Sequence, residues 1–114
     1  MPRTVVIVDD HAPFRASARR LLEVEGYDVV GEAGDAASAV ETVERLRPDV
    51  VLLDVVLPDG SGFDVAERLV GSDATVVLVS SHDRSDLASR LRRSSAAGFI
   101  PKDELSTETL AELV

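Results

Sequence analysis

The stretch Val50-Val51-Leu52-Leu53-Asp54-Val55-Val56-Leu57-Pro58-Asp59-Gly60-Ser61-Gly62 decides the fold, because a run of apolar residues carries one acid and then enters a turn. Four consecutive apolar residues followed by turn formers are typical of a strand that is buried on both faces, as the inner strands of parallel sheets are. A carboxylate at the end of such a strand costs several kcal/mol unless a cation or hydrogen-bond donors meet it. The rest of the chain must therefore supply a partner for Asp54.

Length and composition favour one domain over residues 1–114, and 45% hydrophobic residues are enough to bury a core. With no cysteine, a disulfide framework, a thiolate metal site and a cysteine nucleophile are excluded. The residues from Met1 onward lack the long apolar segment of a signal peptide, and no run approaches the ~20 apolar residues of a membrane span, so we expect a cytoplasmic chain without membrane contact. A net charge of −9 disfavours nucleic acid, so DNA binding would need a further domain.

Apolar runs and helical periodicities alternate along the chain. Besides the Asp54 strand, short apolar runs predict strands at 4–8, 27–33, 75–79 and 98–100. Apolar residues at helical spacing predict helices at 11–25, 36–46, 63–70, 83–95 and 107–114. The helix at 83–95 has a thin apolar stripe, so we expect it to be lightly anchored. The last helix stops before it looks finished, so we expect it to be truncated and an output domain to be absent from this chain.

The alternation of strands and helices predicts the topology. It favours an α/β domain with right-handed crossovers, specifically a flavodoxin-like (βα)5 three-layer sandwich with parallel sheet order 2-1-3-4-5. In such sheets ligands bind at the carboxyl ends of the strands, where the winding reverses between strands 1 and 3. Asp9 and Asp10 end the first strand and Asp54 ends the third. The topology should bring these three acids together.

Three carboxylates at one sheet edge repel each other unless a cation neutralises them. Mg²⁺, or Mn²⁺ in its place, suits the position because it takes hard oxygen ligands and keeps waters that a phosphate oxygen can replace. We expect Asp10 and Asp54 to be direct ligands, Asp9 to act through water, and the backbone carbonyl of Val56 to add an oxygen. Taken alone, the Asp9-Asp10 pair would often be only a helix cap.

Two further strand ends carry groups suited to an anion. Adjacent strands lie about 4.8 Å apart, so the short hydroxyl of Ser80 could reach a group attached to Asp54, whereas Lys102, about two spacings away, needs its long side chain. In isolation Ser80 would be an ordinary strand-end hydroxyl and Lys102 a solvated lysine. A hydroxyl, a lysine and a divalent cation around one carboxylate are the equipment for phosphoryl transfer to that carboxylate.

An ordered set of motifs covers nearly the whole chain: Asp9-Asp10, Asp54 with Pro58 and Gly60-x-Gly62, Ser80-Ser81, and Phe99-x-x-Lys102. This set resembles the receiver domain of bacterial two-component response regulators. The Asp-Asp-His opening, and Asp103 and Leu105 after the lysine, are most similar to the NarL/FixJ group, whose receivers precede a LuxR-type helix-turn-helix. Each short motif is weak alone, but the ordered set is highly specific.

The resemblance implies a signalling role rather than an enzyme. It implies that Asp54 accepts a phosphoryl group from a sensor histidine kinase, that Asp9 and Asp10 hold Mg²⁺, that Ser80 and Lys102 bind the phosphoryl oxygens, and that Phe99 is the switch aromatic. On phosphorylation we expect Ser80 to move toward the new group, Phe99 to turn inward and the helix at 83–95 to shift. A homodimer of the phosphorylated form and DNA contact through the absent output domain are the expected consequences.

The chain departs from the family pattern after Lys102, where Asp103 replaces the proline that many receivers have, often with a cis peptide bond. The local backbone between Lys102 and Asp103 is therefore open. Pro101 precedes the lysine and removes a backbone donor, which only an edge strand tolerates well.

Other polar residues have ordinary interpretations beside functional ones. Asp59 is expected to be a turn former, and His11 to pack or hydrogen-bond rather than bind a metal that prefers oxygen. His82 should overlook the mouth of the site, where hindering or orienting water would tune the lifetime of a phosphoryl group. Four arginines are expected to form a solvated helix face: Arg84, Arg90, Arg92 and Arg93.

Two rival functions are weighed against the receiver. A phosphatase of the haloacid dehalogenase type carries a second acid two residues after its nucleophile, and here that position is Val56. A flavodoxin would need a phosphate-binding loop rich in hydroxyl groups and glycine after the first strand, but this chain has Asp9 to Ala12 there. A protein-interaction module that signals without phosphorylation stays open, although the intact set of site residues argues against it.

Overall fold

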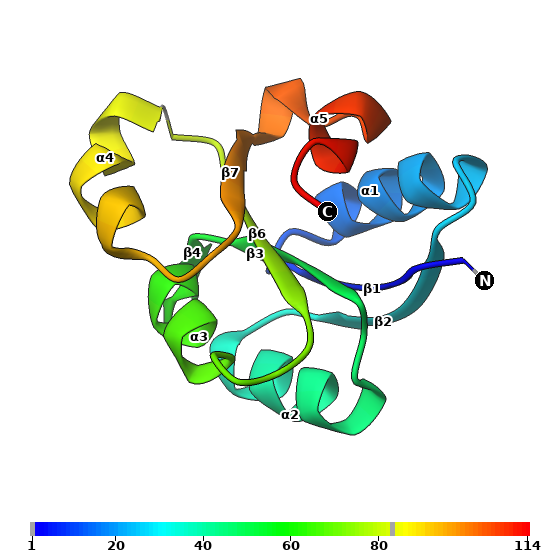
Figure 1. Ribbon diagram of the computed structural model, residues 1–114, viewed down its shortest axis with the longest axis horizontal. Helices are drawn as coiled ribbons and strands as arrows, with labels where there is room; N and C mark the ends of the chain where they lie inside the picture. Colours follow the sequence, from blue (N-terminus) through cyan, green and yellow to red (C-terminus); the bar gives the residue numbers. More distant parts are fainter. Residues whose placement is uncertain (1, 83) are drawn as a thin grey trace.

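The central sheet positions the site. The structure, a computed structural model, describes residues 2–82 and 84–114. Five parallel strands lie in the order β2 (Asp28–Ala33), β1 (Thr4–Val8), β3 (Val50–Asp54), β6 (Thr75–Ser80) and β7 (Gly98–Pro101) (Figure 1). Because β6 and β7 are the fourth and fifth strands of this sheet, the predicted order 2-1-3-4-5 is confirmed.

Helices cover both faces of the sheet, as the three-layer prediction requires. One face carries α1 (Ala12–Val24) and α5 (Thr107–Ala111), and the other carries α2 (Ala36–Leu46), α3 (Gly62–Arg68) and α4 (Arg84–Arg93) (Figure 1). A short 3-10 helix, η1 (Lys102–Glu104), leads from β7 toward α5. The predicted start of the fourth helix at Asp83 lies outside the described residues.

Alternation along the inner strands divides the core into two layers. In β1, Val6 and Val8 belong to the cluster under α2 and α3, whereas Val5 and Ile7 belong to the cluster under α1 and α5. Successive side chains of a strand point to opposite faces, so a strand covered on both faces must be apolar throughout. This requirement explains why the polar residues of the inner strands stand only at the first or last position of a strand.

Helix α4 is the least anchored of the five helices. It contains no buried residue, and only Leu87 and Leu91 pack, partly exposed, against the core. Arg90 adds a contact on the surface, with its guanidinium 4.5 Å from the centre of the Phe63 ring. The thin apolar stripe read from the sequence therefore makes the core contacts of this helix, and few buried contacts oppose its movement.

The turn after Asp54 contains a two-residue hairpin, β4 (Val56–Leu57) and β5 (Gly60–Ser61), that the sequence did not predict. The N–H of Gly62 donates to the carbonyl of Val55 at 2.7 Å. A β-carbon on Gly62 would collide with the main-chain carbonyl of Asp54, whereas one on Gly60 would make an ordinary contact. Only the second glycine of the Gly60-x-Gly62 motif is thus required by close approach of the backbone.

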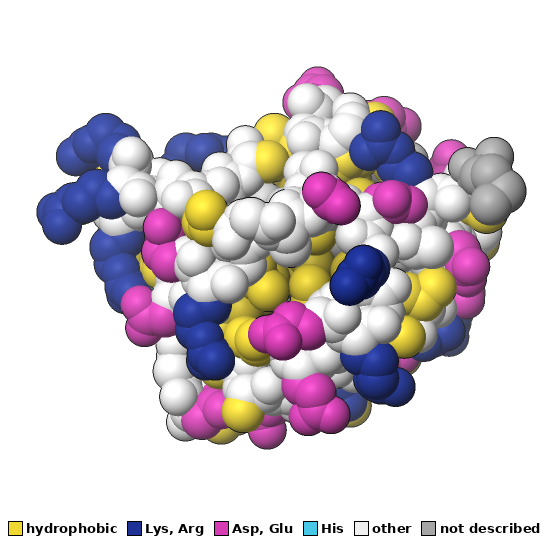
Figure 2. Space-filling model, turned by 60° about the horizontal axis from the view of Figure 1, so that its bottom comes forward, with side chains coloured by type: hydrophobic (Ala, Val, Ile, Leu, Met, Phe, Trp, Pro, Cys, Tyr) yellow, Lys and Arg dark blue, Asp and Glu magenta, His cyan; other side chains and the backbone are white. Residues whose placement is uncertain are grey.

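Charge is distributed unevenly over the surface. Figure 2 shows a group of basic side chains at the left edge of the molecule, on the side of α4, and further separate basic side chains among the acidic ones over the rest of this face. The last turn of α4 carries Arg90, Arg92 and Arg93. No helix in the described ranges is both long enough and apolar enough to cross a membrane.

Candidate functional site

The carboxyl ends of four strands meet at one edge of the sheet. Asp9 directly follows β1, Asp54 ends β3, Ser80 ends β6, and Lys102 follows β7. Ser80 is in register with Pro101, so the residue after Pro101 enters the site from the neighbouring strand. Asp9, Asp54 and Ser80 are buried, with exposed fractions of 0%, 5% and 1%, whereas Asp10 is exposed. The reversal of winding places them together, as the topology predicted.

The three acids form a compact oxygen cluster. Asp9, Asp10 and Asp54 each offer one carboxylate oxygen, and these oxygens lie within 4.8 Å of one another. Oδ2 of Asp9 is fully buried, and no hydrogen-bond donor among the described residues is aligned with it, although Lys102 lies at ion-pair distance. Hard oxygen donors, one of them with unused acceptor capacity, fit the requirements of Mg²⁺.

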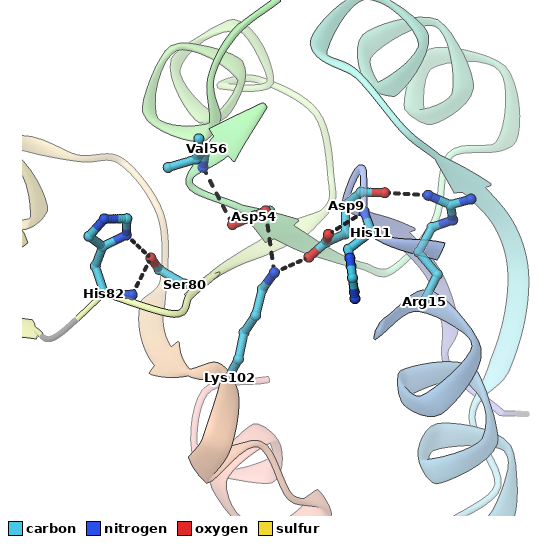
Figure 3. A network of polar contacts seen from close by, with 8 residues as sticks. All are labelled: Asp9, His11, Arg15, Asp54, Val56, Ser80, His82 and Lys102. Carbon is cyan, nitrogen blue, oxygen red and sulfur yellow. Dashed lines mark hydrogen bonds and ion pairs between the residues drawn. The ribbon is translucent and has the colours of Figure 1, made fainter. Parts of the chain in front are cut away.

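Lys102 bridges two of the acids in this conformation (Figure 3). Its Nζ lies 2.6 Å from Oδ2 of Asp9 and 3.4 Å from Oδ2 of Asp54. The same ammonium sits 4.6 Å from the centre of the Phe14 ring, a favourable position for a cation over an aromatic face. A single lysine from the edge strand thus supplies the countercharge that the buried strand-end carboxylate needs.

Burial and mutual repulsion set the ionisation of the site. Burial, and then the charge of Asp9, raise the pKa of Asp54 above 3.8, while Lys102 and the N–H of Val56 oppose the rise. Burial lowers the pKa of Lys102, but its close contact with Asp9 and the negative charges of Asp54 and Asp9 together outweigh burial and raise that pKa. An additional cation would relieve the repulsion between the acids.

Ser80 is held by its neighbour His82. The hydroxyl oxygen of Ser80 accepts from the N–H of His82 at 2.9 Å and lies 3.3 Å from Nδ1 of the imidazole (Figure 3). With Nδ1 unprotonated, the hydroxyl proton points to His82. The single proton that Ser80 could give to an anion on Asp54 is then already in use.

A cavity of about 450 Å³ opens over the cluster. The predicted site residues that line it are Asp10, Asp54, Val56, Ser80, His82 and Lys102. His11 also lines it, in agreement with a packing role beside the site. Val56 turns its N–H toward Oδ1 of Asp54 at 3.4 Å and exposes its side chain.

Phe99 lies apart from this cavity. Its ring is buried, with an exposed fraction of 4%, in the cluster beneath α2 and α3. Arg84 fixes it from the start of α4, because Nη2 donates to the carbonyl of Phe99 at 2.9 Å and the guanidinium lies 5.2 Å from the ring centre. The ring of Phe99 is therefore already buried in this conformation. Its expected inward turn on phosphorylation, and with it the switch role, stays a prediction.

The structure defines the backbone between Lys102 and Asp103, which the sequence left open. Every described peptide bond is trans, and Lys102 opens the 3-10 turn η1. Pro101 ends β7 at the edge of the sheet, where its missing N–H is tolerated, as predicted.

Sequence reasoning missed two residues that support the acids. Phe14, assigned to the core face of its helix, also lies against Lys102. Arg15 reaches back to the main chain of Asp9, with Nη1 donating to its carbonyl at 2.5 Å. A cation one helical turn after an acidic pair is the only signal in the sequence, and it does not reveal which way that side chain turns.

Comparison with known proteins agrees with this geometry. The family model described as "Response regulator receiver domain" matches residues 5–114. Transcriptional regulatory protein PdtaR of Mycobacterium tuberculosis is 37% identical over 103 residues, which cover 90% of this chain and 50% of that protein. Nitrate/nitrite response regulator protein NarP of Escherichia coli is 40% identical over 116 residues, covering 99% and 54%.

Solved structures extend the likeness to three dimensions. The signal receiver domain of the putative response regulator NarL from Mycobacterium tuberculosis superposes with a TM-score of 0.88 at 36% identity, covering 97% of this chain and 92% of that one. The chain spans about half the length of the curated relatives it matches.

Proposed function

The chain belongs to the response regulator receiver domains, of the NarL type, and we propose that Asp54 accepts a phosphoryl group from a sensor histidine kinase. The observation that carries the proposal is the cluster of three carboxylates within 4.8 Å, with Lys102 against two of them. The cluster surrounds a buried acid that faces a cavity. The carboxylate of Asp54, the ammonium of Lys102 and a cavity that is open to a phosphoryl donor therefore lie next to one another.

Asp54 is the nucleophile in the proposed transfer. One of its carboxylate oxygens attacks the phosphorus of the phosphohistidine in line, a P–O bond forms as the P–N bond breaks, and the electron pair leaves with the imidazole nitrogen. Asp10 and Asp54 would hold Mg²⁺ directly, Asp9 would act through a water, and the backbone carbonyl of Val56 would add a further oxygen. When bound, Mg²⁺ neutralises charge that develops on the phosphoryl oxygens.

Lys102 and Ser80 receive the new anion. Lys102 reaches Asp54 already, so a small shift of its ammonium away from Asp9 lets it contact a phosphoryl oxygen. The Ser80 hydroxyl must leave the Nδ1 of His82 to donate to another oxygen. Phosphorylation would thus exchange the ion pair of Lys102 with Asp9 and the contact of Ser80 with His82 for contacts with the phosphoryl oxygens.

The signal is proposed to leave through α4. The backbone of Phe99 and the start of α4 are joined by Arg84, so a change at the end of β6 or β7 is transmitted to the helix with the fewest buried contacts. A shift from about 1% to about 99% active needs about 5.5 kcal/mol between the states. One hydrogen bond contributes less than that. Partner binding or dimerisation of the phosphorylated form supplies the remainder in this proposal.

The output is proposed to be transcription control by a domain that follows the receiver. PdtaR, of which this chain covers 50%, is named as a transcriptional regulatory protein, which supports an output in transcription control. The strongly acidic receiver, with its net charge of −9, would contact DNA only through such a domain.

Intact mass spectrometry tests the acceptor. The native chain is incubated with acetyl phosphate and Mg²⁺, beside Asp54→Ala and a sample with Mg²⁺ chelated. A phosphate-sized mass gain that is labile to alkali, and that appears only in the native chain with Mg²⁺, is the expected result. The absence of a gain in the native chain would instead favour an interaction module that signals without phosphorylation.

A further inference from the structure

The main chain of Asp9 is fixed from two sides, and one of the two contacts comes from a residue outside the cavity. The N–H of Asp9 donates to the carbonyl of Ala33 on β2 at 3.0 Å. The carbonyl of Asp9 accepts from Nη1 of Arg15, the fourth residue of α1, at 2.5 Å (Figure 3). Because the chain has just left β1 here, no strand ladder holds that carbonyl, and Arg15 takes over this task.

Arg15 is itself held in place. Its Nε donates to Oε1 of Glu32 on β2 at 3.0 Å, and its side chain is only 23% exposed. The planar guanidinium therefore donates from Nε to Glu32 and from Nη1 to the Asp9 carbonyl at the same time. A lysine, which has one ammonium and no planar set of donors, cannot reproduce this geometry. Arg15 therefore links Glu32, on the outer strand of the sheet, to the loop that carries Asp9 and Asp10.

Fixing this carbonyl also fixes the next residue. The carbonyl of Asp9 and the N–H of Asp10 belong to one planar peptide unit, so the direction in which Asp10 leaves the loop follows from the orientation of that plane. Asp10 is exposed and contributes to the oxygen cluster with Asp9 and Asp54. Its place in the cluster thus depends on the loop backbone rather than on burial.

We propose that Arg15, held by Glu32, is a positioning residue that orients the Asp9–Asp10 peptide and thereby prearranges the acid cluster for a divalent cation. It binds neither the cation nor the phosphoryl group. This inference rests on the proposed Mg²⁺ site, and partners that orient metal ligands typically change metal affinity by 10-fold or more when they are removed.

Arg19 provides a matched control. It lies on the same helix and pairs with the same carboxylate, with Nε 2.8 Å from Oε2 of Glu32, but its Nη1 contacts Glu23 rather than Asp9. Arg15→Met and Arg19→Met each remove one positive charge and one ion pair with Glu32 while keeping an unbranched side chain. Only the first variant removes the donor to the Asp9 carbonyl.

The experiment measures Mg²⁺ affinity by isothermal titration calorimetry on the unphosphorylated native chain, Arg15→Met, Arg19→Met and Arg15→Lys, with thermal unfolding as a check of folding. We expect Arg15→Met to weaken Mg²⁺ binding about tenfold, Arg19→Met to change it less than twofold, and the two melting temperatures to fall by similar amounts. Arg15→Lys, which keeps the charge and favours the helix, should also bind Mg²⁺ several-fold more weakly than Arg19→Met.

The outcomes separate this inference from the proposed function. Equal affinities in the Arg15 and Arg19 variants would overturn the positioning role. Tighter Mg²⁺ binding in Arg15→Met, with native affinity in Arg15→Lys, would also overturn it, because Arg15 would then act only as a nearby repelling charge. No Mg²⁺ binding by the native chain would instead refute the metal site of the proposed function.

Discussion

Nζ of Lys102 lies 2.6 Å from Oδ2 of Asp9, so the ammonium of the residue that follows the edge strand lies between the carboxylates of Asp9 and Asp54. Lys102→Met keeps the stem of the side chain but leaves two buried carboxylates without this countercharge. We expect the free energy of unfolding without Mg²⁺ to fall by about 2 kcal/mol, because an unpaired buried polar group keeps its full desolvation cost.

Mg²⁺ should restore part of the lost stability of Lys102→Met, since a bound ligand stabilises the folded state and no ammonium competes for Asp9. The measurement is urea unfolding of the native chain and the variant, each with and without Mg²⁺. Equal Mg²⁺ increments in the two proteins would show that the lysine and the cation do not share the acids.

The sequence predicted the positions of these groups through the strands. Runs of apolar residues end where polar residues begin, so the sequence alone places Asp9, Asp54 and Ser80 at the ends of strands. The order of a doubly wound sheet then put those ends side by side. Burial on both faces makes such strands easy to recognise, which is why the inner part of the fold was predictable.

Contacts between separate loops were not predictable in the same way. Asp59 was expected only to form a turn, yet its carboxylate accepts from the N–H groups of Ala36 and Ala37, 22 or more positions earlier in the chain. The reach of Arg15 to Asp9 and the inward ring of Phe99 depend likewise on side-chain rotamers and on which loops become neighbours. Neither periodicity nor motif spacing encodes these choices.

His82 should control the hydroxyl of Ser80. The phosphoryl analogue beryllium trifluoride, added with Mg²⁺, needs the hydroxyl proton of Ser80, for which Nδ1 of His82 competes when that nitrogen carries no proton. We expect His82→Ala to bind the analogue about fivefold more tightly, since one competing hydrogen bond contributes about 1 kcal/mol. His82→Asn, whose side-chain oxygen can stand near the place of Nδ1, should keep an affinity close to native.

Calorimetric titration of the analogue into the three proteins measures this effect, and the dephosphorylation rate of each phosphorylated chain is followed in parallel. Identical affinities in the alanine and native proteins would show that His82 does not restrain Ser80. An unchanged dephosphorylation rate in His82→Ala would remove the separate prediction that the imidazole tunes phosphoryl lifetime.

Gly62 should be intolerant of any side chain. A β-carbon there would collide with the carbonyl of Asp54, so Gly62→Ala must displace the strand end that bears the acceptor. We expect a loss of about 3 kcal/mol in the free energy of unfolding and a weakened Mg²⁺ affinity. Gly60→Ala is the matched control, and it should change stability by less than about 0.5 kcal/mol because its β-carbon would meet only Ala36 at 3.7 Å. Denaturant unfolding measures the free energy of unfolding of both variants. Equal losses in Gly62→Ala and Gly60→Ala would contradict the steric argument.

Asp59 should make the stability of the chain depend on acid pH. Hydrogen bonds from the N–H groups of Ala36 and then Ala37 lower the pKa of Asp59 below 3.8, so the folded state prefers the charged form. The stabilisation is complete above the unfolded pKa and is lost as the pH falls through the folded pKa. Asp59→Asn should therefore be less stable than the native chain at pH 7, and the difference should shrink below about pH 4. Chemical unfolding of both proteins from pH 7 to pH 2.5 measures it, and a constant difference would contradict the assignment.

Arg84 should hold the start of α4 against Phe99. The helix buries no residue of its own, so the charged hydrogen bond from Arg84 to the Phe99 carbonyl, at 2.9 Å, is a large part of its attachment. A hydrogen bond to a charged group contributes about 1.5 kcal/mol or more, and Arg84→Met should raise amide hydrogen exchange about tenfold in α4 but not in β6. Arg92→Met, on the same helix, should leave exchange unchanged. If both variants loosen α4 equally, net charge rather than the Phe99 contact holds the helix, and the proposed route from the phosphoryl site to α4 loses its physical link.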